Sequence, residues 1–178
     1  MKATPSGIKK LVFMSLFVAL TIVCVRFLSI ENTIIRISLG FIPLSVSGMT
    51  LGALPAGAIA LAADVLGMII NSRGGVYFFP FGISEFLYGF SFGFILYKKN
   101  PSFIKLSLFL VLQFIIINLA LGSLWIYLYN MFIIGTPKTF CLVFSTRTIS
   151  AAAQLPVQIV VINLLQKYLA PQIKRFNI

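Results

Sequence analysis

Long apolar runs separated by short polar connections make up almost the whole chain. A helix needs about 20 apolar residues to cross the hydrocarbon core of a bilayer. The pattern predicts six such helices, at about residues 8–28, 38–51, 55–70, 79–97, 106–129 and 146–167. The sequence therefore predicts an all-α integral membrane protein with one membrane domain over residues 1–178.

The apolar run from residue 37 to residue 63 carries no charge, but Pro43, Gly48, Gly52 and Pro55 interrupt it. These residues divide the run into a short second helix and a third helix. Interrupted membrane helices expose backbone groups, which are tolerated where they line a cavity, and transporters often bind substrates at such places.

Basic residues outnumber acidic residues by 14 to 3, although only 10% of the chain is charged. Nine of the basic residues follow the positive-inside bias and predict that both termini are cytoplasmic. They are Lys2, Lys9, Lys10, Lys98, Lys99, Lys105, Lys167, Lys174 and Arg175.

The other five basic residues fall at the opposite face, where the bias gives no reason for them. They are Arg26, Arg36, Arg73, Lys138 and Arg147. Four of the five are arginine, whose planar guanidinium pairs well with carboxylates and phosphates. This distribution indicates a membrane protein that collects an anion from outside the cell.

Several kinds of chemistry are absent from the sequence. It has no Gly-x-x-x-x-Gly-Lys loop for ATP and no histidine. Only Glu31, Asp64 and Glu85 supply carboxylates, so we expect no enzyme, no metal site and no cofactor. Because the lysines flank apolar spans, they favour contact with lipid headgroups and exclude a nucleic-acid partner.

Asp64 and Glu85 lie inside predicted membrane helices, where ionisable groups are costly and usually functional. They could neutralise a nearby arginine and hold the bundle together. Alternatively, they could accept hydrogen bonds from a ligand that presents adjacent N–H donors.

Two further patterns lie on the predicted helices. Arg147, Ser150, Gln154 and Gln158 form a polar stripe on the last helix, which either binds a ligand or joins helices by hydrogen bonds. Aromatic residues at helical spacing around Glu85, and others around Trp125, either form core and interfacial contacts or stack on a flat ligand.

Ser15 and Ala19 form a pair of small residues four apart on the first helix. Such a pair allows close helix approach. It serves either packing within this chain or docking to a partner membrane protein.

Part of the chain resembles a known family, the substrate-binding (S) components of energy-coupling factor (ECF) vitamin transporters. The segment Arg36-Ile-Ser-Leu-Gly-Phe-Ile-Pro43 is similar to the start of their second helix. Further similar segments are Gly48-Met-Thr-Leu-Gly-Ala-Leu-Pro-Ala-Gly57, Ala63-Asp64-Val-Leu-Gly67, Gly75-Val-Tyr-Phe-Phe-Pro80-Phe-Gly82 and Leu87-Tyr-Gly89. The resemblance is strongest over residues 36–98, and within the family the chain is most similar to the folate-specific S components.

The resemblance implies a six-helix bundle in a prokaryotic cell membrane that binds one vitamin from outside with high affinity. It also implies docking on an ECF transmembrane coupling subunit that two ATPase subunits drive. The family's contact motif on the first helix is Ala-x-x-x-Ala. Ser15 and Ala19 match it here, with serine at the first position.

Folate fits the polar residues singled out above. Its glutamate tail is a dianion, which calls for outer cations: Arg26, Arg73 and Arg147, and secondarily Arg36 and Lys138. Its pterin ring presents adjacent N–H donors, for which we expect Asp64 or Glu85 as the acceptor. Candidates for the remaining contacts are Tyr77, Phe78, Trp125, Gln154 and the loop with Arg73 and Gly75, which could act as a lid.

Three other hypotheses remain open from the sequence. The chain could bind another vitamin, such as pantothenate or a thiamine derivative, although a ligand poor in carboxylates would leave the outer arginines unexplained. It could be a small proton-coupled transporter that uses Asp64 or Glu85 as a relay. It could also be a purely structural membrane subunit.

Overall fold

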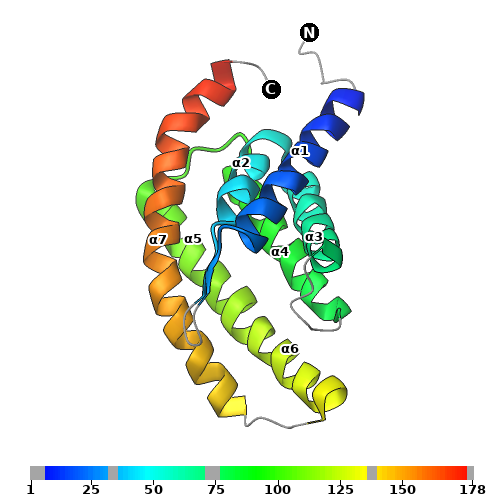
Figure 1. The fold of residues 1–178 in the computed structure, drawn as a ribbon. Coiled ribbons are helices and arrows are strands. Elements are labelled where there is room, and N and C mark those ends of the chain that lie inside the picture. The colour runs from blue at the N-terminus through cyan, green and yellow to red at the C-terminus, as the bar shows by residue number, and fades with distance from the viewer. Residues whose placement is uncertain (1–6, 32–35, 71–76, 136–139, 176–178) are drawn as a thin grey trace.

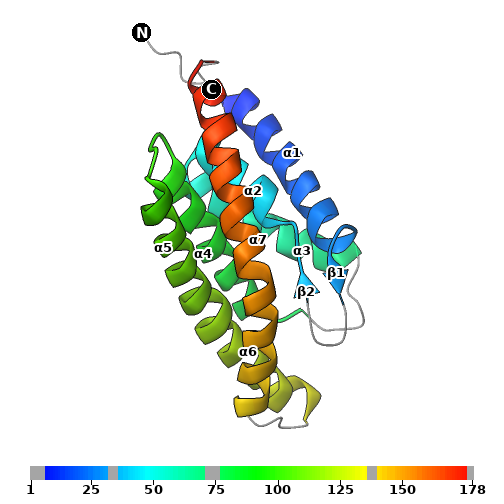
Figure 2. The same ribbon diagram turned by 90° about the vertical axis from the view of Figure 1, so that its left-hand side faces the viewer.

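The computed structural model describes residues 7–31, 36–70, 77–135 and 140–175. The elements are α1 (Gly7–Arg26), β1 (Ile30–Glu31), β2 (Arg36–Ile37), α2 (Phe41–Leu51), α3 (Ala53–Ile70), α4 (Phe79–Leu96), α5 (Phe103–Gln113), η1 (Phe114–Leu121), α6 (Gly122–Tyr129), η2 (Asn130–Ile134) and α7 (Phe140–Arg175). The helices form one elongated bundle, and the start of α1 and the end of α7 lie at the same end of it (Figure 1). The side view in Figure 2 shows α7 running along most of the bundle's length.

Five of the described helical segments are long and apolar enough to span a membrane. They are Gly7–Arg26, Ala53–Ile70, Phe79–Leu96, Phe103–Ile134 and Val143–Ile173, and the shorter apolar helix Phe41–Leu51 joins them. Large apolar side chains are exposed along each of the five long segments. An apolar exterior of this kind suits contact with lipid, so the chain is a multi-pass membrane protein.

The second and third helices differ by a few residues from their predicted starts. Helix α2 begins at Phe41 and α3 begins at Ala53, so Pro43 and Pro55 both lie in the first helical turn. A proline is tolerated there because the first N–H groups of a helix have no partner within it. Gly52 separates the two helices with φ 95°, a conformation that glycine adopts without strain.

The fifth predicted helix is longer than residues 106–129. It begins at Phe103, continues without a break to Ile134 and includes two π-helical stretches, η1 and η2. A π-helical stretch winds more loosely than an α-helix and often occurs at functional sites. Periodicity at 3.6 residues per turn cannot show such a stretch.

The last helix also exceeds its prediction of residues 146–167. Helix α7 spans Phe140–Arg175 and contains Pro156 and Pro171, although we expected Pro171 to follow its end. Each proline removes one hydrogen-bond donor, and membrane helices tolerate this loss because neighbouring groups can satisfy the freed carbonyl.

A small β-ribbon replaces part of the polar connection predicted after the first helix. Strands β1 and β2 pair antiparallel, with Ile30 opposite Ile37 and Glu31 opposite Arg36. The ribbon begins just after α1 and leads directly into α2, so it determines where α2 starts beside the end of α1 (Figure 2).

Glycines allow α4 to approach α2 and α3 at backbone distance. A Cβ atom on Gly89 would clash with the carbonyl oxygen of Ala56, and one on Gly93 would clash with the backbone of Ala53. A Cβ on Gly48 of α2 would lie 2.8 Å from the backbone nitrogen of Gly93. Because lipid is as apolar as the side chains, close packing of this kind is a main source of helix association in a membrane.

The apolar core lies beside this contact. It includes Phe41 and Leu44 of α2, Ile59 of α3, Phe92 and Leu96 of α4, Leu106 and Leu110 of α5 and Ile162 of α7. The core therefore joins five helices near the end of the bundle that carries both termini (Figure 1).

We expect Gly93→Val to destabilise the bundle, because the neighbouring atoms are backbone and cannot move aside. Overpacking of this kind costs about 1–3 kcal/mol in the free energy of unfolding, and more when backbones must separate. Thermal unfolding of the purified protein in detergent measures the effect. Gly7→Val is the matched control, because a Cβ there meets no atom within 4 Å. Equal stability of the two variants would contradict the prediction.

Candidate functional site

A cavity of about 570 Å³ lies between the helices, a size typical of pockets for small ligands. Its polar and aromatic lining includes Thr21, Arg26, Ser38, Asp64, Tyr77, Phe78, Phe81, Glu85, Tyr88, Asn118, Tyr129, Arg147, Ser150 and Gln154. Phe41 and Leu44 belong both to this lining and to the apolar core, so the core forms the floor of the cavity.

One wall of the cavity carries the carboxylates. Asp64 comes from α3 and Glu85 comes from α4, and Tyr77 lies just before α4. Burial and the negative charges of Asp64 and Glu85 raise the pKa of the Tyr77 hydroxyl above its ordinary value of 10.0. Both carboxylates oppose a phenolate because like charges repel.

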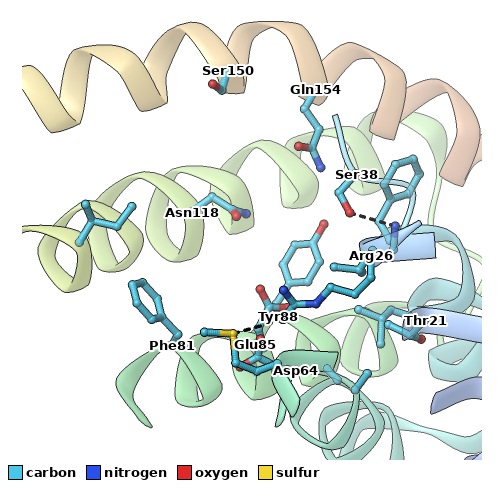
Figure 3. A pocket seen from close by; sticks show the side chains of 18 of the residues that line it. Thr21, Arg26, Ser38, Asp64, Phe81, Glu85, Tyr88, Asn118, Ser150 and Gln154 are labelled. Carbon is cyan, nitrogen blue, oxygen red and sulfur yellow. Dashed lines mark hydrogen bonds between the residues drawn. The ribbon is translucent and has the colours of Figure 1, made fainter. Parts of the chain in front are cut away.

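Arg26 reaches this wall from the end of α1. Its side chain extends toward Tyr88, Asp64 and Glu85 in Figure 3, and its Nη2 donates to the sulfur of Met68 at 3.8 Å. It lies directly over Gly67 of α3, where a Cβ would approach the Arg26 Nε to 2.9 Å. The positive charge of Arg26 therefore lies among the negative charges of the carboxylate wall.

Arg147 lies on a different wall, which α6 and α7 form. Its Nη1 donates to the carbonyl oxygen of Gly122 at 3.2 Å. Ser150 and Gln154 follow it along α7 and point into the cavity, and Asn118 lies near them on η1 (Figure 3). This wall offers a cation and several neutral hydrogen-bonding groups.

Aromatic rings line the space beside the two polar walls. Phe78, Phe81 and Tyr129 form a cluster in which the ring centroids are 5.7 to 6.1 Å apart. Tyr88 contacts Phe92 edge-to-face at 4.9 Å, so a ring of the cavity wall packs directly on the core. Aromatic walls of this kind suit a flat ligand.

Trp125 does not line the cavity, contrary to its expected role in stacking. Its indole N–H donates to the hydroxyl of Ser84 at 2.9 Å. Trp125 shares a face of the fifth membrane helix with Asn118 and Tyr129, which do line the cavity. A shared helix face therefore does not show which of its residues reach the cavity.

Two buried amide side chains, Gln113 and Gln158, lie inside the bundle next to residues of the cavity lining. The side chain of Gln113 donates to the carbonyl oxygen of Tyr88 at 3.2 Å and to the hydroxyl of Ser91 at 2.6 Å. Gln158, the last residue of the predicted polar stripe, is 1% exposed and follows the lining residue Gln154 toward the C-terminal end of α7. The stripe therefore divides, with three members at the cavity and one inside the bundle.

Besides Trp125, four of the expected ligand residues are not placed at the cavity. Arg73, Gly75 and Lys138 lie outside the described residues. Arg36 lies in β2, where its backbone pairs with Glu31. The expected lid around Gly75 stays a prediction.

The small pair on α1 faces outward. Ser15 and Ala19 are both exposed, and the hydroxyl of Ser15 donates to the carbonyl oxygen of Val12 at 2.9 Å. The buried residues of α1, Thr21 and Ile22, lie in its C-terminal half. The outward face of α1 that carries Ser15 and Ala19 is therefore open to a partner, while Arg26, at the last residue, reaches the cavity.

Several lining residues were not among the predicted site residues. Phe81 and Tyr88 share a helix face with Glu85, and that face was a usable signal. Ser38 and Met68 carried no signal in the sequence, because they reach the cavity only through the packing of α1, α2 and α3.

Comparisons with known proteins agree on one kind of protein. Residues 6–171 match the family model described as "ECF-type riboflavin transporter, S component". A folate transporter, FolT, from Clostridium novyi (strain NT) is 36% identical over 152 residues, which cover 85% of this chain and 84% of the relative. The solved structure "Crystal structure of FolT bound with folic acid" is similar with a TM-score of 0.79 at 30% identity, over 90% of this chain and 94% of that one.

The raised pKa of Tyr77 leads to a spectroscopic prediction. We expect its phenol to keep its proton to higher pH than an unperturbed tyrosine of pKa 10.0, because burial and two carboxylates oppose a phenolate. Asp64→Asn removes one of those charges and should lower that pKa. Ultraviolet titration of wild type minus Tyr77→Phe isolates this phenol. A Tyr77 titration unchanged by Asp64→Asn would contradict the arrangement of this wall.

Proposed function

Because the chain belongs to the S-component family of ECF-type transporters, we propose that it captures folate in its central cavity for uptake across the cell membrane. The family membership confirms the resemblance seen over residues 36–98. It also agrees with the absence of an ATP-binding motif, since S components depend on separate ATPase subunits for energy.

The observation that carries the proposal is the chemical difference between the two polar walls of the cavity. Asp64 and Glu85 line one wall, and Arg147 lines another together with Ser150 and Gln154. Folate has the matching difference, with a pterin ring that presents N–H donors at one end and a glutamate dianion at the other. Charge-assisted hydrogen bonds contribute about 1.5–3 kcal/mol each, so a few of them supply much of a sub-micromolar affinity.

We infer that the pterin lies against the carboxylate wall and that the glutamate tail reaches Arg147. Phe78 and Phe81 lie beside the carboxylates and would cover the faces of the ring. Arg26 reaches toward the carboxylates in Figure 3. The structure therefore favours a role for Arg26 in balancing their charge, in place of the tail contact that the sequence suggested.

The description of the matched family model names riboflavin, which is a second candidate ligand. Riboflavin also has a flat ring with N–H and C=O groups that a carboxylate wall could read. Its side chain carries hydroxyl groups and no carboxylate, so it would leave the Arg147 guanidinium without a charged partner. The presence of Arg147 in the cavity therefore favours folate.

The energy for uptake would come from an ECF module. Its transmembrane coupling subunit would contact the exposed face of α1 at Ser15 and Ala19, and two ATPase subunits would drive it. The start of α1 and the end of α7 lie at one end of the bundle, and by the positive-inside bias of the basic residues that end would face the cytoplasm (Figure 1). The cavity would then open outward.

We expect the purified protein to bind folate at sub-micromolar concentration and Arg147→Ala to weaken this binding at least about tenfold, because one charge-assisted contact is lost. Isothermal titration in detergent measures both affinities. Arg175→Ala, at the last residue of α7, removes an arginine from the opposite end of the helix and is the matched control. Binding of riboflavin in preference to folate would reject the substrate assignment.

Folate uptake into cells should require all partner subunits. We expect cells that express this chain alone to accumulate no folate above background, and cells that also express an ECF module to accumulate it. An inactive ATPase subunit should abolish the uptake. Uptake that follows a pH gradient in cells without the module would instead support a proton-coupled transporter.

A further inference from the structure

Polar side chains at the cavity lie over glycines of neighbouring elements in three places. Arg147 lies over Gly122 of α6, and Arg26 lies over Gly67 of α3. The Tyr77 hydroxyl lies over Gly82 of α4. In each pair the glycine stands where any other residue would place a side chain against the polar group. These glycines differ from Gly89 and Gly93, which face backbone atoms of another helix.

In the Gly122 pair, the missing Cβ would meet three atoms of one guanidinium. A Cβ on Gly122 would lie 2.6 Å from Nη2 of Arg147, 2.8 Å from its Cζ and 3.1 Å from its Nη1. Carbon atoms of real side chains essentially never approach this closely, so the guanidinium occupies the volume of the missing side chain. The same contact brings Nη1 to 3.2 Å from the Gly122 carbonyl oxygen, which accepts its hydrogen bond.

We propose that Gly122 is a positioning residue for ligand binding, because it provides the space and the carbonyl acceptor that hold the Arg147 guanidinium at the cavity wall. This inference rests on the proposed function only in assigning the carboxylate tail of folate to Arg147. Helix α6 lies beside α7 at the end of the bundle away from the termini, so the two residues meet across this interface (Figure 1).

The physical reason is the conformational entropy that a long side chain loses when it binds a ligand. An arginine loses many rotamers when it binds an anion, and a guanidinium that is already held in place loses fewer. The carbonyl of Gly122 orients one edge of the planar guanidinium, and its other N–H groups keep a fixed direction as a result. Gly122 therefore acts through Arg147 and needs no contact with the ligand itself.

Gly122→Ala is a suitable test because the atoms it displaces belong to the far end of a flexible side chain. The bundle can absorb the extra methyl group by moving the guanidinium, and alanine is a better helix former than glycine. We therefore expect the variant to fold with a melting temperature no lower than that of the wild type. Ser123→Ala changes the next residue of α6 and is the matched control.

The first measurement is a double-mutant cycle with folate affinity as the readout. We expect Gly122→Ala to weaken folate binding about tenfold in the wild type, as loss of a charge-assisted contact does. In the Arg147→Ala background it should change the affinity by less than about twofold. Equal losses in both backgrounds, or wild-type affinity of Gly122→Ala, would overturn the proposal, whereas a wild type that binds no folate would reject the proposed function instead.

The second measurement needs no ligand. An arginine-selective dicarbonyl reagent, with peptide mass spectrometry, gives the modification rate of each arginine in the full-length protein. We expect Gly122→Ala to raise the rate at Arg147 by about threefold or more and to leave Arg26 unchanged, because the added methyl group displaces the guanidinium from the Gly122 carbonyl. Gly67→Ala should do the reverse. Unchanged reactivity of Arg147 in Gly122→Ala would overturn the proposal whatever the protein binds.

Discussion

Backbone contact between α4 and its neighbours α2 and α3 is the constraint on which the rest of this structure depends. Gly89 and Gly93 place α4 against Ala56 and Ala53 with no side chain between them. In lipid the hydrophobic effect does not drive helices together, so van der Waals packing at such contacts must do so. These three helices form a closely packed unit. The remaining helices pack beside it, and the cavity lies between them and the unit.

The cavity also gives the charged side chains of the membrane helices a place away from lipid. Asp64, Glu85, Arg26 and Arg147 would each be costly if they faced lipid. The structure turns all four toward one polar space, which their opposite charges and nearby hydrogen-bonding groups make favourable. Polar groups that must face inward for stability are then also available to a ligand.

The separation of these charges decides what the cavity can recognise. If the two arginines lay together, they would form a site for any small dianion. With Arg26 among the carboxylates and Arg147 across α6 and α7, the lining instead matches a long ligand whose ends differ. This arrangement favours folate over the vitamins with a single kind of polar group, and under the proposed function Asp64 and Glu85 would bind the ligand without proton coupling.

The sequence by itself determined the class of protein and the number and order of its membrane helices. It also identified the charged, polar and aromatic side chains that could bind a vitamin. These features are local, because hydropathy, helix-breaking residues and charge are properties of short segments. The helix ends at Ile134 and Arg175, the π-helical turns and the β-ribbon depend on partners distant in the chain. Distant partners also decide that Trp125 stays outside the cavity lining and that Ser38 and Met68 belong to it. Only the tertiary structure decided which arginine faces which wall and which glycine lies beneath it, because these contacts form when helices far apart in the sequence come together.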